Sequence, residues 1–140
     1  MQSTGTIRYS PPALGESQGQ NWWIIVDCQA EIGKYYRQLY KGFHWNCREL
    51  KKPAWAEHIS VGRNEEPPNK EFWEKYNGQT VDFTYTLQAQ TDGVYCWLPV
   101  QCDFLLDLRV ELGLPREPEF PLHLTFGLNF EGQDGLLGLL

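Results

Sequence analysis

The chain has 140 residues, with six Trp, seven Tyr and seven Phe, and a formal net charge of −6. This length fits one domain spanning 1–140, and the apolar content excludes a disordered chain. The negative charge argues against a protein that binds long nucleic acid, where neutralised phosphates supply most of the affinity, but it is compatible with a small anion held in a cleft.

Targeting and metal signals are absent from the sequence pattern. No run approaches the roughly 20 apolar residues of a membrane span, and residues 1–10 lack the apolar region of a signal peptide, so we expect a cytosolic protein with no membrane partner. No Cys-x-x-Cys pair and no histidine at zinc-finger spacing occurs. We therefore expect buried thiols, no metal and no cofactor. The four cysteines are Cys28, Cys47, Cys96 and Cys102.

The first part of the chain is predicted to alternate strands and one helix. Residues 6–9 indicate a short edge strand, and the apolar run 22–26 indicates a buried central strand. Asp27 is expected to cap a helix over 28–41, whose apolar residues recur at helical spacing. A loop with basic residues follows, and 55–61 is predicted to be a strand.

The second part is predicted to add a hairpin and two helices. A short helix is expected over 69–76, and 81–87 alternates apolar and polar residues as a half-buried strand does. A turn leads to a strand over 94–100, followed by an amphipathic helix over 103–112 and a last strand over 122–128. This order predicts an α+β fold with mainly antiparallel sheets and flanking helices.

Two short segments carry the chemistry. They read His58-Ile59-Ser60-Val61 and His123-Leu124-Thr125-Phe126. Because side chains alternate along a strand, each segment presents one imidazole and one hydroxyl on the face opposite its apolar residues, about 7 Å apart. If the two strands lie side by side, two imidazoles and two hydroxyls converge on one pocket.

Phosphodiester transfer needs this set of groups. One neutral imidazole takes a proton from the attacking hydroxyl, and the other, as imidazolium, gives a proton to the leaving oxygen. A histidine pKa near 6.5 lets both forms coexist near neutral pH. Ser60 and Thr125 would donate hydrogen bonds to the non-bridging oxygens, where charge develops. The opposing interpretation is that each histidine is an ordinary strand residue, but two copies in the same frame favour a site.

With two copies of His-apolar-Ser/Thr-apolar, the chain resembles the 2H phosphoesterase superfamily. That resemblance implies two similar α+β lobes around a central cleft, with one motif from each lobe. The segments Gly5–Tyr9, Glu57–Pro67 and Phe120–Gly127 resemble more closely the phage anti-CBASS phosphodiesterases, which degrade cyclic oligonucleotide messengers of bacterial defence. The resemblance implies cleavage of a 3′–5′ linkage by its own ribose 2′-hydroxyl, in the host cytoplasm.

The resemblance also implies roles for individual residues. His58, Ser60, His123 and Thr125 would be catalytic, and Tyr9 would stack on a base; the alternative for Tyr9 is an aromatic residue of an edge strand that covers the core. The related enzymes carry a base-stacking Trp near the C-terminus, and residues 129–140 of this chain contain none. Either Phe130 substitutes for it or the C-terminal tail closes differently.

Two further residues are candidates from their positions alone. Arg63, just past the first motif, would hold a phosphate through its planar fork, and Trp55 would line the rim of the cleft. The alternative for Arg63 is an ordinary solvated residue of a turn.

Three functions are compatible with these motifs. The first is a metal-independent phosphodiesterase of cyclic dinucleotides or oligonucleotides, acting in phage counter-defence. The second is an RNA-end enzyme that opens 2′,3′-cyclic phosphates by the same chemistry. The third is a non-catalytic protein that sequesters the cyclic nucleotide, against which the completeness of both motifs argues.

Overall fold

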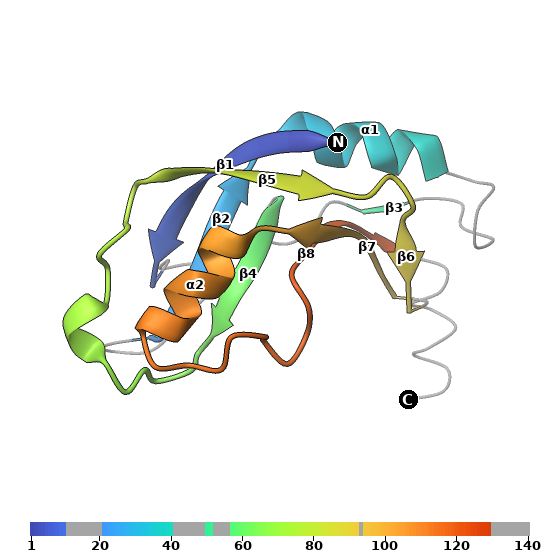
Figure 1. Cartoon of the computed structure of the whole chain (residues 1–140). Helices are drawn as coiled ribbons and strands as arrows, with labels where there is room; N and C mark the ends of the chain where they lie inside the picture. Colours follow the sequence, from blue (N-terminus) through green and yellow to red (C-terminus); the bar gives the residue numbers. More distant parts are fainter. Residues whose placement is uncertain (11–20, 41–49, 52–56, 93, 130–140) are drawn as a thin grey trace.

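The computed structural model describes residues 1–10, 21–40, 50–51, 57–92 and 94–129 (Figure 1). The elements are, in order, β1 (Gln2–Tyr9), β2 (Trp23–Cys28), α1 (Ala30–Tyr40), β3 (Leu50–Lys51), β4 (His58–Arg63), the 3₁₀ turn η2 (Lys70–Phe72), β5 (Thr80–Tyr85), β6 (Gln90–Thr91), β7 (Tyr95–Gln101), α2 (Asp103–Glu111) and β8 (His123–Asn129).

Six of the strands close into a barrel. The pairings run β1–β2–β4–β8–β7–β5 and back to β1, and every one of them is antiparallel. The short strands β3 and β6 extend the sheet at β8 and β7. This confirms the α+β class and the antiparallel sheet. The closure into one ring was not predicted, because it depends on pairings between strands far apart in the sequence.

Alternating burial gives the strands one apolar face. In β5, Val81, Phe83 and Tyr85 are buried while Asp82 and Thr84 are exposed, as the alternation in the sequence predicts. The apolar faces of all six barrel strands contribute to a single hydrophobic core, to which both helices add buried side chains. Helix α1 contacts β8, and α2 contacts β4.

The molecule consists of two similar halves in sequence order. The first is β1–β2–α1–β4 and the second is β5–β7–α2–β8, and each half forms an antiparallel sheet with its motif strand, β4 or β8, at one side. The halves join through β1–β5 on one side and β4–β8 on the other. At the second junction Ile59 pairs with Leu124, which are the same position of the two motifs. The order of strands and helix thus repeats once along the chain, but the expected division into two lobes around a central cleft is not confirmed, because the six strands form one closed barrel.

The sequence predictions fail at three local points. The strand predicted over 6–9 is not an edge strand, because β1 pairs with both β2 and β5. Asp27 does not cap a helix, because β2 continues through Cys28 and α1 begins at Ala30. The carboxylate of Asp27 instead binds Arg8 on the neighbouring strand. The helix predicted over 69–76 is reduced to the three-residue η2, followed by turns.

The described cysteines lie in the hydrophobic core or against it. Burial raises the pKa of the Cys28 and Cys102 thiols above their ordinary values. Cys47 lies outside the described residues. Among the helices in the described ranges, none has the length and apolar character required to cross a membrane.

Candidate active site

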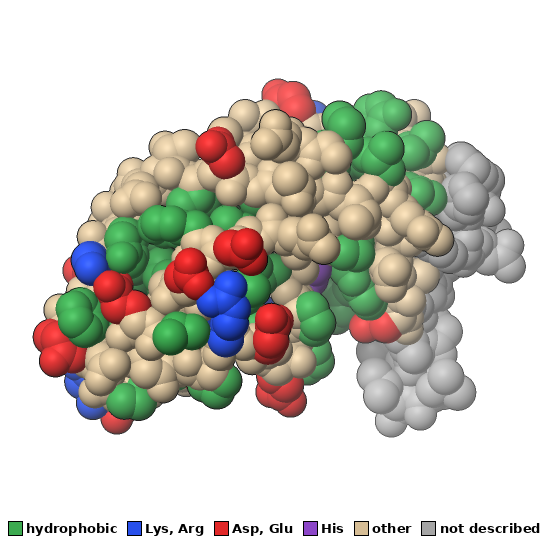
Figure 2. All heavy atoms as spheres, viewed as in Figure 1, with side chains coloured by type: hydrophobic (Ala, Val, Ile, Leu, Met, Phe, Trp, Pro, Cys, Tyr) green, Lys and Arg blue, Asp and Glu red, His purple; other side chains and the backbone are tan. Residues whose placement is uncertain are grey.

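The two motif strands lie side by side and antiparallel. Their register is fixed by the pair Ile59 and Leu124, both of which are 0% exposed and point into the core. Because residues alternate between faces, the histidine and hydroxyl residue of each motif lie on the opposite face of the sheet. Figure 2 shows a histidine side chain, in purple, within a hollow of the surface. The structure thus brings the two predicted motifs together on one accessible face.

The antiparallel register pairs each imidazole with the hydroxyl of the other motif. One residue beyond Ile59–Leu124 in each direction, His123 stands opposite Ser60 and Thr125 stands opposite His58. Facing residues in such pairs have Cβ atoms about 4.5–5.5 Å apart, and diagonal neighbours about 7–8 Å. The four side chains therefore form a quadrilateral with the imidazoles at opposite corners.

Each motif strand bends just after its hydroxyl residue. In β4 the pairing with β2 passes from Ser60 to Gly62 and omits Val61, and in β8 the pairing with β7 omits Phe126 at the same position. Such a bulge kinks a strand and redirects nearby side chains. At Gly62 an added Cβ would lie 3.2 Å from the Ile24 side chain, so the glycine permits close packing of the bent strand.

His123 is held in one orientation. Its Nδ1 lies 2.7 Å from the carbonyl oxygen of Pro121, and its ring centroid lies 5.8 Å from that of Trp97. A carbonyl oxygen only accepts, so Nδ1 carries the hydrogen and Nε2 of the neutral ring is left with its lone pair. Burial lowers the pKa of His123, opposed by the contact with Pro121, and the positive charges of Arg63 and His58 lower it further.

His58 occupies a more polar setting. It is half-buried, and Asp27 stands opposite it on β2. The carboxylate of Asp27 is held by Arg8, whose Nη2 donates to Oδ1 over 3.0 Å and whose Nε lies 2.8 Å from Oδ2. Ser60, on the same face, is 9% exposed. The ion pair of Arg8 and Asp27 therefore stands beside His58 on this side of the site.

Arg63 extends the site beyond the first motif. Burial lowers the pKa of its guanidinium, and Glu65 and Glu119 oppose this shift. The guanidinium lies over the Phe120 ring, 5.3 Å from the centroid, and Phe120 is 53% exposed. The positive charge of Arg63 also lowers the pKa of His123, so these two side chains lie near each other. The Arg63 guanidinium, the His123 imidazole and the exposed Phe120 ring therefore form one group.

Tyr9 is not part of this group. Its side chain is 7% exposed and lies in the hydrophobic core, where its ring meets that of Trp73 edge-on at 5.0 Å. Burial raises its pKa to about 12. A ring covered in this way offers no free face to a base, so the expected stacking role does not fit its position. Trp55 and Phe130, the other two expected contacts, lie outside the described residues.

Trp97 lies beside the site but was not among the residues predicted from the sequence. In β7 the alternate residues Cys96, Leu98 and Val100 are buried, whereas Trp97 is half-buried on the other face and faces Thr125. The alternation along this strand contained the signal, because it separates Trp97 from the apolar set.

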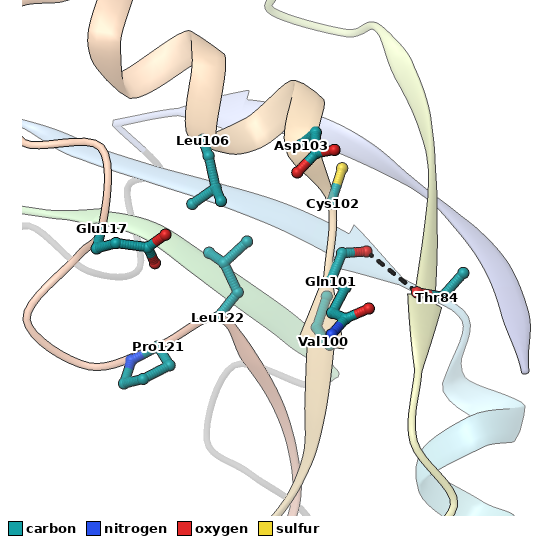
Figure 3. Close-up of a pocket in the computed structure, with 9 residues that line it drawn as sticks. All are labelled: Thr84, Val100, Gln101, Cys102, Asp103, Leu106, Glu117, Pro121 and Leu122. Carbon is teal, nitrogen blue, oxygen red and sulfur yellow. Dashed lines mark hydrogen bonds between the residues drawn. The ribbon is translucent and has the colours of Figure 1, made fainter.

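A separate pocket lies between α2, β5 and β7 (Figure 3). Its volume is about 540 Å³, and none of the described residues that line it belongs to the four motif residues or carries a positive charge. Asp103 and Glu117 give it an acidic lining, which suits a phosphate poorly. Within the described part of the chain, no three His, Cys, Asp or Glu side chains gather as metal ligands.

Comparisons with protein-family models, curated proteins and solved structures find no match to this chain.

Proposed function

We propose that this protein is a phosphodiesterase that cleaves 3′–5′ linkages in cyclic dinucleotides or oligonucleotides, using two histidines and no metal. The observation that carries the proposal is the antiparallel register of β4 and β8, which faces Ser60 toward His123 and Thr125 toward His58. Paired imidazoles and hydroxyls on one accessible face are the groups that acid–base cleavage of a phosphodiester requires.

The differences between the histidines assign their roles. His123 has a lowered pKa and an Nε2 that is free to accept, which suits the general base. His58, opposite the Asp27 carboxylate, suits the general acid. His123 takes the proton of the ribose 2′-hydroxyl, whose oxygen forms a bond to phosphorus. The bond from phosphorus to the 5′-oxygen breaks, and His58 gives that oxygen its proton.

Neighbouring groups support the same step. The hydroxyls of Ser60 and Thr125 donate to the non-bridging oxygens, which gain charge in the transition state. Arg63 supplies a fixed positive charge close to His123, so an anion is attracted locally although the chain carries −6 overall. Phe120 and Trp97 are the aromatic surfaces on which a base would stack. The first products are a 2′,3′-cyclic phosphate and a free 5′-hydroxyl.

The biological setting follows from the resemblance to the phage anti-CBASS enzymes. We extend the proposal to an enzyme of phage counter-defence that removes cyclic oligonucleotide messengers in the host cytoplasm.

The test is digestion of a panel of 3′,3′-cyclic dinucleotides and trinucleotides in the presence of EDTA. Wild type should linearise at least one of them, His58→Ala should lose about 10²–10⁴ in rate, and His44→Ala, outside both motifs, should match wild type. Intact substrates after long incubation with folded protein would overturn the proposal. Preferred turnover of a 2′,3′-cyclic mononucleotide would assign RNA ends instead, and release of unchanged nucleotide would indicate sequestration.

A further inference from the structure

Each helix carries one arginine with little exposed surface, at the same place in its half. Arg37 on α1 and Arg109 on α2 are 72 residues apart, as are Ile25 and Trp97, which pair with the motif hydroxyl residues. Arg109 is 1% exposed and the Arg37 side chain 15%. Burying a guanidinium is costly unless its donors are satisfied, so the partners of these two residues need an explanation.

Arg37 reaches from the first half to the motif strand of the second. Its Nη1 donates to the carbonyl oxygen of Phe126 over 2.9 Å and to Oε1 of Glu57 over 2.7 Å. Glu57 directly precedes His58 and is 2% exposed. Gly33, one turn before Arg37, leaves room for this carboxylate, because an added Cβ would lie 2.0 Å from Oε1. Arg37 thus ties β4 and β8 together from behind the site.

Arg109 makes the reciprocal connection. Its Nη1 donates to the carbonyl oxygen of Val61 over 2.7 Å, and its Nε donates to the carbonyl oxygen of Pro115 over 2.8 Å. Both oxygens of Glu65 accept from its guanidinium, over 2.8 and 3.1 Å. Glu65 in turn accepts from the backbone N–H of Arg63. The helix of the second half therefore holds the motif strand of the first.

The two carbonyl groups that accept from Arg37 and Arg109 belong to the bulged residues of the motif strands. Val61 and Phe126 are the residues omitted from the pairing of the motif strands with β2 and β7. A bulged residue is left without its ladder partner, and a buried carbonyl needs a donor. Within the described residues, β4 and β8 pair through Ile59 and Leu124 alone. Away from that pair, the distance between β4 and β8 depends on hydrogen bonds to other parts of the molecule.

We propose that Arg37 and Arg109 are positioning residues that fix the two bulges and so set the distance between the two histidine–hydroxyl pairs. The inference deepens the proposed function and depends on it, since neither arginine reaches the face where the phosphate binds. The contrasting role is stability alone, in which the ion pairs hold the helices to the barrel without affecting the chemistry.

Lysine substitution separates these roles. Arg37→Lys and Arg109→Lys keep the charge but lose the planar fork. We expect kcat for a cyclic dinucleotide to fall by about 10-fold to 100-fold with KM nearly unchanged, because a displacement of about 1 Å can cost a hundred-fold. The imidazole NMR signals of His58 and His123 should move. Arg116→Lys, which alters an exposed ion pair with Asp107, is the matched control and should match wild type.

A double variant covers the case in which lysine prevents folding. Arg37→Met combined with Glu57→Met removes both members of a buried pair, a change that proteins often tolerate. The same loss of kcat and the same NMR shifts are expected. Folded variants with wild-type kcat and wild-type imidazole signals overturn the inference, and so does failure of every variant to fold. If wild type turns over no substrate, the proposed function fails, while the NMR signals still decide the positioning role.

Discussion

The two motif strands share a backbone plan but differ in what surrounds each histidine. In β4 the residue opposite His58 is Asp27, and in β8 the residue opposite His123 is Pro99. His123 also lies against Trp97, and the positive charge of Arg63 acts on it. Two copies of one scaffold thus give one imidazole a carboxylate neighbour and the other an aromatic ring and a cation. Under the proposed function, these equivalent positions perform opposite proton transfers.

The largest effect is expected when the two histidines are removed one at a time. His58→Ala and His123→Ala should each lower kcat by about 10²–10⁴, with the fold retained because both side chains are only half-buried on the polar face. In pH–rate profiles, loss of the base should abolish the acidic limb and loss of the acid the alkaline limb. Profiles with the limbs exchanged would reverse our assignment of roles.

The hydroxyl residues should be closer to equivalent than the histidines. Ser60→Ala and Thr125→Val each remove one donor to the transition state, and we expect kcat to fall by about 10² in both, with KM little changed. Steady-state kinetics on the two variants checks this. An effect confined to one of them would mean that the phosphate lies toward one strand only.

Removing the carboxylate opposite His58 tests the asymmetry directly. Asp27→Asn should lower kcat by about threefold to tenfold, because the carboxylate opposite His58 is lost. Arg8→Gln, which removes only the partner of Asp27, serves as the comparison and should lower kcat less. Wild-type kcat in Asp27→Asn would remove Asp27 from the mechanism.

The smallest effect concerns stability. Burial lowers the pKa of His123 in the folded state, so the unfolded chain binds the proton more readily. Stability should therefore fall as pH decreases through the unfolded value near 6.5 and level off below the folded value. Urea unfolding at pH 7.5 and 5.5 should show this loss in wild type and a smaller one in His123→Gln. Equal losses in the two proteins would contradict it.

The sequence predicted what depends on local pattern. Alternation along the motif strands placed the imidazoles and hydroxyls on one face, and the same rule found β5 and β7. The sequence pattern did not reveal that β2 continues past Asp27 to Cys28, because this extension depends on pairing with β1 and β4. The sequence predicted α2 but not that Arg109 on this helix is buried. A buried charge is recognisable only once its distant partners are in place.

Closure of the barrel has a further consequence for how this chain can fold. Taken alone, the sheet of either half would present an unpaired strand at each side, β1 and β4 in one case and β5 and β8 in the other. Open strand edges of this kind invite aggregation. Each half thus pairs with both edge strands of the other half. A gene fragment that encodes only one half should yield insoluble protein, whereas the two halves expressed together should reassemble.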